Sequence, residues 1–181
     1  MKNAKAVFLD RDGTLISSVH YLRNFSQLRL LPKVAEAIRI LNKKNYLVFV
    51  ITNQAVVARG YITETTLKAI HEELLRRLKR KGARVDGIFY CPHHPNADMP
   101  VYRKDCKYRK PNTGFVDEVV EKYSISRNDS YFIGDTETDM QTARNAKLHS
   151  IYINHNTKEP IDAEYRVKTV YEAVTSIITK T

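Results

Sequence analysis

The chain has 181 residues with 43% hydrophobic side chains, enough for one domain with a substantial core and too many for a disordered protein. Its apolar runs, such as 47–51, fall far short of the roughly 20 residues of a membrane span, and no signal-peptide pattern opens the chain. The net charge of +10 is compatible with nucleic acid, a phosphorylated small substrate or only a well-solvated surface. We therefore expect a soluble cytoplasmic protein, monomeric by default, without a membrane partner.

Short apolar strands alternate with amphipathic helices along the chain. Strands are predicted at 6–9, 47–51, 85–90, 130–133 and 149–153. Helices are predicted at 34–41, 63–82, 116–123, 140–146 and 171–178. Fully apolar strands between helices indicate a parallel sheet that is covered by helices on both faces. The sequence thus predicts a single α/β domain of Rossmann-like type over residues 1–181.

Polar side chains follow three of these strands. Asp10 and Asp12 come after the first strand, Thr52 follows the second, and Asp135 follows the fourth. The carboxyl ends of parallel strands line the binding crevice in such sheets, so these side chains are expected to converge. Two neighbouring carboxylates repel each other unless a cation or proton lies between them, and Mg²⁺ with oxygen ligands fits this pattern. The sequence predicts a magnesium site that would also attract a phosphate, with Asp139 supporting Asp135.

Four ordered segments resemble the motifs of the haloacid dehalogenase superfamily of phosphatases. They are Phe-Leu-Asp-Arg-Asp-Gly-Thr-Leu at 8–15, Ile-Thr-Asn-Gln at 51–54, Arg-Lys-Pro at 109–111 and Gly-Asp-Thr-Glu-Thr-Asp at 134–139. A closer resemblance to heptose 1,7-bisphosphate phosphatases rests on Ala-Arg-Gly at 58–60 and Tyr-Cys-Pro-His-His-Pro at 90–95. The resemblance covers nearly the whole chain and implies a compact phosphatase without a large cap domain.

The resemblance implies catalytic roles for the acidic residues. Asp10 would be the nucleophile that forms an aspartyl-phosphate, and Asp12 would be the general acid and base. Mg²⁺ would be held by the Asp10 side chain, the main-chain carbonyl of Asp12 and Asp135. The implied reaction is hydrolysis of heptose 1,7-bisphosphate to heptose 1-phosphate, a step toward lipopolysaccharide or capsule.

Further residues are assigned by the same resemblance. Thr52 and Lys110 would stabilise the transferring phosphoryl group, and Arg109 would assist substrate recognition. Specificity would come from short loops at about 17–31, 54–61 and 91–109. The remaining substrate-binding candidates in or beside these loops are Ser18, Val19, His20, Tyr21, Asn53, Gln54 and Arg59.

The two cysteines are too few for a disulfide framework and suggest free thiols or metal ligands. Relatives carry Cys-x-His followed by Cys-x-Cys as a structural zinc site, and here Cys91, His93 and Cys106 occupy three of the four places. Tyr108 occupies the fourth, although structural zinc sites are nearly always four-coordinate. The sequence leaves zinc binding open: the fourth ligand would come from His94, Asp98 or Asp105, or the cysteines pack as small hydrophobic residues.

Three alternatives compete with a heptose bisphosphate phosphatase. Histidinol phosphate is an alternative substrate, because its phosphatases share the same motifs. The basic run 76–81 suggests a second alternative, a nucleic-acid-binding protein or nucleic-acid 3′-phosphatase. No aromatic platform accompanies this run, so we expect no nucleic-acid partner. A phospho-receiver module would carry its aspartate after a central strand of the chain and not after the first.

Overall fold

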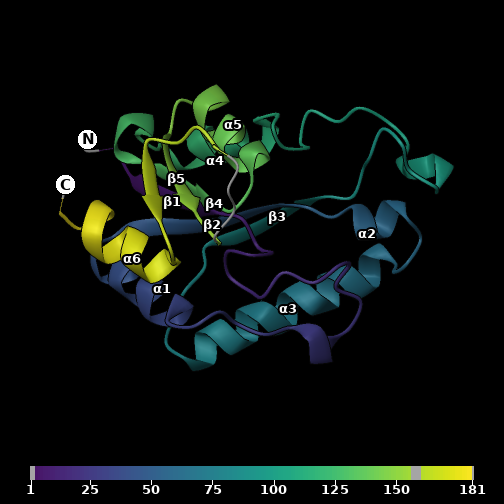
Figure 1. Ribbon diagram of the computed structural model, residues 1–181, viewed down its shortest axis with the longest axis horizontal. Coiled ribbons are helices and arrows are strands. Elements are labelled where there is room, and N and C mark those ends of the chain that lie inside the picture. Colours follow the sequence, from purple (N-terminus) through teal and green to yellow (C-terminus); the bar gives the residue numbers. More distant parts are fainter. Residues whose placement is uncertain (1–2, 156–159, 181) are drawn as a thin grey trace.

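The computed structural model describes residues 3–155 and 160–180 of the chain (Figure 1). Its described part contains six strands in one sheet, and every neighbouring pair is parallel. The strand order is β3-β2-β1-β4-β5-β6, so the chain starts in the middle of the sheet. The strands are β1 (Lys5–Leu9), β2 (Tyr46–Asn53), β3 (Gly87–Cys91), β4 (Tyr131–Gly134), β5 (His149–Ile153) and β6 (Tyr165–Val167).

Helices cover both faces of the sheet. They are α1 (Val34–Lys43), α2 (Ala55–Ala58), α3 (Glu64–Arg80), α4 (Gly114–Tyr123), α5 (Glu137–Asn145) and α6 (Val170–Ala173). Leu41 of α1, Leu74 of α3 and Ala173 of α6 belong to one hydrophobic cluster. Val116 of α4 and Ala143 of α5 belong to another. Figure 1 shows the same division, with α1, α3 and α6 on one side of the strands and α4 and α5 on the other. The predicted α/β sheet covered on both faces is confirmed.

The two-residue period of β1 explains why both faces are apolar. Val7 and Leu9 pack into the α1/α3/α6 cluster, whereas Phe8 faces α4 and α5. The Phe8 ring stacks between Phe49 at 5.7 Å and Phe132 at 6.4 Å on the adjacent strands. A central strand buried on both faces is therefore hydrophobic without interruption, and it carries the residues that follow it into the crevice.

The structure adds three short 3-10 helices, at 25–27, 100–102 and 127–129, and differs from the sequence prediction in further segments. The strand at 165–167 and the short helix at 55–58 were not predicted, because each is too short to show a hydrophobic period. The predicted helix at 171–178 is α-helical only to Ala173 and continues as a π-helix over 174–178. Thr63 caps α3 as predicted, with its hydroxyl accepting from the Thr66 amide.

In the part of the chain that the structure describes, no helix combines the length and the apolar character of a membrane span.

Candidate active site

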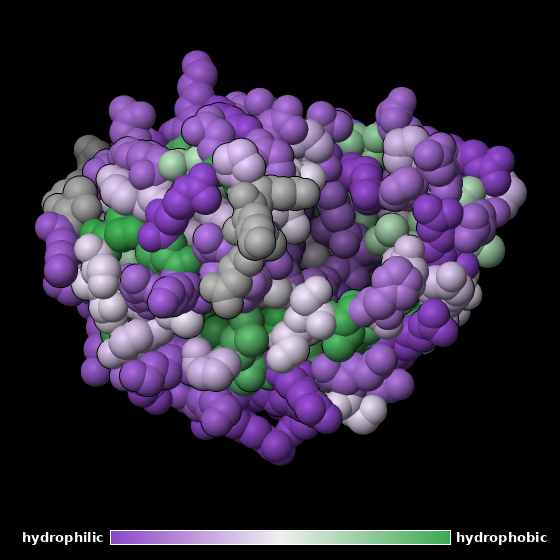
Figure 2. Space-filling view, viewed as in Figure 1, coloured by the Kyte–Doolittle hydropathy of each residue, from purple (hydrophilic) through white to green (hydrophobic). Residues whose placement is uncertain are grey.

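The loops after β1, β2 and β4, together with the segment that leads into α4, enclose a pocket of about 260 Å³ at the carboxyl edge of the sheet. Figure 2 shows the molecule hollowed right of its centre, with hydrophilic residues above and inside the hollow and hydrophobic ones along its lower edge. The convergence predicted from the strand ends is therefore present. The pocket is lined by Asp10, Asp12, Ser18, Thr52, Asn53, Lys110, Asp135, Thr136 and Thr138.

At the base of this pocket, one buried lysine joins two buried carboxylates. Lys110 Nζ lies 2.5 Å from Asp10 Oδ1 and 2.5 Å from Asp139 Oδ1. The three side chains are at most 10% exposed, so their charges are weakly screened. These two carboxylates raise the pKa of the Lys110 ammonium against the opposing effect of its burial, and Lys110 therefore stays charged. Asp139 also accepts from the Thr136 hydroxyl, which fixes its second oxygen.

A third carboxylate, Asp135, completes a group of acidic oxygens. One oxygen each of Asp10, Asp135 and Asp139 lies within 4.8 Å of the others. Burial raises the pKa of Asp10 and of Asp135 to about 7, and the neighbouring carboxylates add to the rise. Within residues 3–155 and 160–180, Lys110 is the one cationic side chain paired with this group of three carboxylates, so their ionised forms require a further cation. Asp135 Oδ1 is buried and has no hydrogen-bond partner among the residues that the structure describes, as expected of an oxygen that awaits a metal ion.

Gly13 makes the close approach of Asp135 to the β1 loop feasible. Its φ of +75° lies in the left-handed region, and a Cβ there would overlap the Asp135 carboxylate. The donor set of hard oxygen atoms fits Mg²⁺, with Asp10 and Asp135 as the side chains that would hold it. The Asp12 main-chain carbonyl, which the resemblance adds, belongs to the same loop.

The Asp12 side chain, expected to face the cation beside Asp10, has a different set of partners. Arg11 Nη2 donates to Asp12 Oδ2 at 2.8 Å and to Oδ1 at 3.0 Å. Gln54 Nε2 donates to Asp12 Oδ2 at 2.9 Å and to Thr52 Oγ1 at 2.9 Å. Asp12 is therefore outside the group of three metal-facing carboxylates, although it lines the same pocket. Arg11 and Gln54 therefore hold the Asp12 carboxyl at the wall of the pocket.

Asn53 and Arg109 hold the backbone around Lys110. The Asn53 amide donates to the Lys110 carbonyl at 3.0 Å and accepts from the Lys110 amide at 3.0 Å. The Arg109 guanidinium donates to the His93 carbonyl at 2.9 Å, and its partial burial lowers its pKa. Asn53, predicted as a substrate ligand, is thus engaged in positioning Lys110.

A second hollow of about 420 Å³ adjoins the first and shares Asp12, Ser18 and Asn53 with it. Its other walls include three residues of the predicted substrate loop, Val19, His20 and Tyr21. The Tyr21 ring lies 4.4 Å from His20 and 4.9 Å from Tyr61, which joins the loops 17–31 and 54–61. Arg59 instead turns toward the loop 91–109, where its guanidinium pairs with Asp98 at 2.9 Å.

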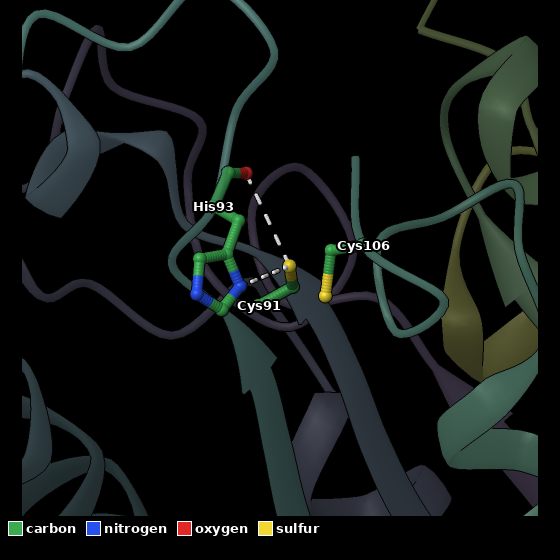
Figure 3. Close-up of side chains that lie close together, drawn as sticks. All are labelled: Cys91, His93 and Cys106. Atoms are coloured by element: carbon green, nitrogen blue, oxygen red, sulfur yellow. Dashed lines mark hydrogen bonds between the residues drawn. The ribbon is translucent and has the colours of Figure 1, made fainter. Parts of the chain in front are cut away.

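Cys91, His93 and Cys106 form a second cluster, at the end of β3 and in the loop that follows it (Figure 3). One ligand atom of each lies within 4.8 Å of the others, and Cys91 Sγ is 3.7 Å from His93 Nδ1. No further His, Cys, Asp or Glu joins this group in the part of the chain that the structure describes. Tyr108 stands at the fourth expected position. Its hydroxyl donates a hydrogen bond to Glu118 Oε1 at 2.5 Å, and its ring stacks on the Phe115 ring with the centroids 4.5 Å apart.

Sequence reasoning missed one buried group beside the site. Arg11 stands in the first motif without a pattern that indicates burial, and His71 on α3 shows no signal beyond its helical position. Both are buried, and Arg11 Nη1 lies 2.9 Å from His71 Nε2. Only the packing of α3 under the β1 loop brings these residues together.

Comparison with known proteins agrees with this geometry. The model of the HAD-hydrolase-like family matches residues 107–177. The D-glycero-beta-D-manno-heptose-1,7-bisphosphate 7-phosphatase of Rhodopseudomonas palustris is 40% identical over 143 residues, which are 79% of this chain and 79% of that protein. The D-glycero-alpha-D-manno-heptose-1,7-bisphosphate 7-phosphatase of Photorhabdus laumondii is 33% identical over 161 residues, 87% of this chain and 88% of its own.

A solved structure shows the same fold. The D,D-heptose 1,7-bisphosphate phosphatase of B. bronchiseptica, complexed with magnesium and phosphate, superposes with a TM-score of 0.84 at 24% identity. The match covers 98% of this chain and 99% of that one. Together with the identity to the R. palustris protein, these findings show that the chain belongs to the heptose-1,7-bisphosphate 7-phosphatase family within the HAD-like hydrolases.

Proposed function

We propose that the protein is a magnesium-dependent phosphatase that converts D-glycero-D-manno-heptose 1,7-bisphosphate to heptose 1-phosphate through an aspartyl-phosphate. The observation that carries this proposal is the buried Asp10–Lys110–Asp139 arrangement beside Asp135, whose Oδ1 lacks a hydrogen-bond partner within the described part of the chain. The names of the relatives support a heptose bisphosphate as the substrate.

The residues of the pocket divide the chemistry between them. The Asp10 carboxylate attacks phosphorus in line with the leaving sugar oxygen, while Lys110 and the Thr52 hydroxyl balance charge on the phosphoryl oxygens. Asp12 gives a proton to the leaving oxygen and then takes one from the water that hydrolyses the aspartyl-phosphate. When bound, Mg²⁺ supplies positive charge that lets the phosphate approach the carboxylates, and Asp10 and Asp135 would hold it.

Phosphate release tests the mechanism. Chelation with EDTA and the substitution Asp10→Asn are each expected to abolish activity, because one removes the cation and the other the nucleophile. Asp129→Asn is the matched control, since this exposed aspartate precedes β4 and lies outside the pocket. Full activity in EDTA or in Asp10→Asn would overturn the mechanism.

Side-by-side turnover tests the substrate. The heptose bisphosphate is expected to exceed histidinol phosphate in kcat/KM, because the adjoining hollow offers polar side chains for a polyol. The relatives' names include both the alpha and the beta anomer, so both anomers belong in the panel. A preference for histidinol phosphate would replace the heptose assignment with the alternative.

We also propose that zinc binds to Cys91, His93 and Cys106. The proximity of two sulfurs and one imidazole nitrogen supports the site, while the orientation of Tyr108 leaves the fourth position to a ligand from outside the chain. Metal analysis of the purified protein is expected to find about one zinc per chain. Less than a tenth of that amount would favour the alternative that the cysteines only pack.

The cytoplasmic location, the monomeric state and the lack of nucleic-acid binding stay predictions from the sequence. Fractionation and light scattering test the first two. Binding to single and double strands as the salt concentration rises tests the third, because phosphate contacts weaken steeply with salt. The extent of the domain over 1–181, with its three specificity loops, is likewise a proposal, which limited proteolysis tests.

A further inference from the structure

His71 is a buried polar side chain that the proposed reaction does not use. It lies on α3, outside all four motifs, and is 3% exposed. Burial and the neighbouring Arg11 guanidinium lower its pKa to about 3, so the imidazole is neutral at ordinary pH. A neutral imidazole nitrogen accepts a hydrogen bond, and His71 Nε2 lies 2.9 Å from Arg11 Nη1.

Arg11 connects His71 on α3 to the Asp12 carboxyl. Its side chain is 1% exposed, which makes it one of the largest fully buried side chains described. While Nη1 faces His71, Nη2 donates to Gln54 Oε1 at 2.8 Å and to Asp12 Oδ2 at 2.8 Å. The planar guanidinium therefore has its orientation fixed on one side by His71 and on the other by Asp12 and Gln54.

A buried guanidinium is costly unless its donors are paired, so each acceptor influences where it settles. His71 in turn is confined by the Tyr90 ring, whose centroid lies 5.4 Å from that of the imidazole. Without an acceptor at position 71, Nη1 loses its partner on α3. The guanidinium would then turn to find other partners or water, and Asp12 would lose its planar double contact.

We propose that His71 is a positioning residue that orients Arg11, and through Arg11 the Asp12 carboxyl, for protonation of the leaving group. This inference rests on the proposed function. In the first step the bond from Asp10 Oδ to phosphorus forms as the bond from phosphorus to the sugar oxygen breaks. The proton moves from Asp12 to that oxygen, which leaves as a hydroxyl group. Arg11 and Gln54 then stabilise the carboxylate that remains on Asp12.

The competing view is that His71 is only a satisfied core residue. A purely structural role would lower the activity on every substrate by the same factor. A role in proton donation makes the loss depend on the leaving group, because a basic alkoxide needs the proton and nitrophenolate departs without it. The dependence of kcat/KM on leaving-group basicity therefore separates the two views, since it reports the steps up to departure of the leaving group.

The experiment measures kcat/KM with Mg²⁺ for p-nitrophenyl phosphate, phenyl phosphate and the heptose bisphosphate. His71→Leu removes the acceptor, and His71→Gln places an amide oxygen near the position of Nε2. Leu74→Ala, a buried substitution in the next turn of α3, controls for loss of stability. We expect His71→Leu to lose roughly 10- to 100-fold on the heptose bisphosphate and less than about 3-fold on p-nitrophenyl phosphate. His71→Gln should restore most of the loss, and Leu74→Ala should leave the ratio between substrates unchanged.

An equal loss on all three substrates, or no recovery in His71→Gln, would overturn the inference. If His71→Leu does not fold, His71→Asn takes its place, because its shorter amide ends before Arg11 Nη1. A protein that hydrolyses the aryl phosphates but not the heptose bisphosphate refutes only the proposed substrate. The positioning role of His71 is then tested by comparing the loss of kcat/KM on phenyl phosphate with that on p-nitrophenyl phosphate. A protein that hydrolyses none of them refutes both.

Discussion

Replacing Lys110 by methionine removes the only side-chain cation that contacts the carboxylates of Asp10 and Asp139 among the described residues. Methionine keeps most of the length and apolar stem of lysine, so the change deletes the charge with little loss of packing. Both carboxylates remain at most 10% exposed. They must then stay ionised without a cationic side-chain partner among the described residues or take up a proton that the unfolded chain would not bind at neutral pH.

The size of the effect follows from this burial. Removing one partner of a buried ion pair costs about 3–5 kcal/mol, because the remaining charge is uncompensated. For a domain of this size, each kcal/mol lowers Tm by about 2–4 °C, so Lys110→Met should lower Tm by roughly 6–20 °C. The loss of an electrostatic partner for the phosphoryl group should reduce kcat by about 10²- to 10³-fold.

Thermal unfolding in metal-free buffer measures the first effect, and phosphate release with Mg²⁺ measures the second. Lys104→Met is the matched control, because Lys104 is exposed in the same loop and contacts neither carboxylate. A Tm within about 2 °C of that of the unmodified protein would refute the assumption that this buried contact is strong. A kcat reduced less than about 10-fold would refute the role of Lys110 in phosphoryl transfer.

Three further predictions concern other parts of the molecule. The pKa of His71 is about 3 in the folded protein instead of 6.5, so the unfolded chain alone gains this proton as the pH falls through that window. Below about pH 6.5 the unfolding free energy of the protein should therefore fall, relative to that of His71→Gln, by up to about 1.4 kcal/mol per pH unit. Urea unfolding at several pH values measures this, and the same dependence of unfolding free energy on pH in both proteins would contradict it. Tyr108→Cys restores the fourth ligand type and should slow the loss of zinc to a chelator, whereas an unchanged rate would show that the backbone keeps this position away from the site. Gly13→Ala should abolish Mg²⁺-dependent phosphate release, because its Cβ would overlap Asp135, while Gly82→Ala, at a similar φ but near the Arg39 side chain, should retain it.

The sequence predicts the sheet well because the strands are buried on both faces. A continuous apolar run such as 47–51 indicates a buried strand without reference to the rest of the chain. The helix at 64–80 is indicated by the helical spacing of its apolar residues and by its N-cap. The helix at 55–58 packs with Leu67 of α3, and the strand at 165–167 pairs with β5. Both segments are too short to show a period of their own. Their existence is therefore a tertiary property.

The acidic motif residues were predictable for the same reason as the strands. Asp10 follows a recognisable strand, and the parallel arrangement brings Asp135 to the same edge whatever the details of packing. The partners of Asp12 were not predictable. The placement of Arg11 between two aspartates suggests a surface residue, but α3 covers it and supplies His71 as an acceptor.

The sequence by itself therefore determined the α/β sheet, the family and the residues at the strand ends, because these depend on local hydrophobic runs and on motifs. Only the tertiary structure decided which carboxylates face one another, that Asp12 is held by Arg11 and Gln54, and that Tyr108 turns toward Glu118. The physical reason is that these contacts depend on side chains of separate elements: even Arg11 and Asp12, which are neighbours in the sequence, are oriented by His71 on α3 and by Gln54 after β2. Their geometry depends on how helices pack on the sheet, and a linear pattern does not encode that packing locally.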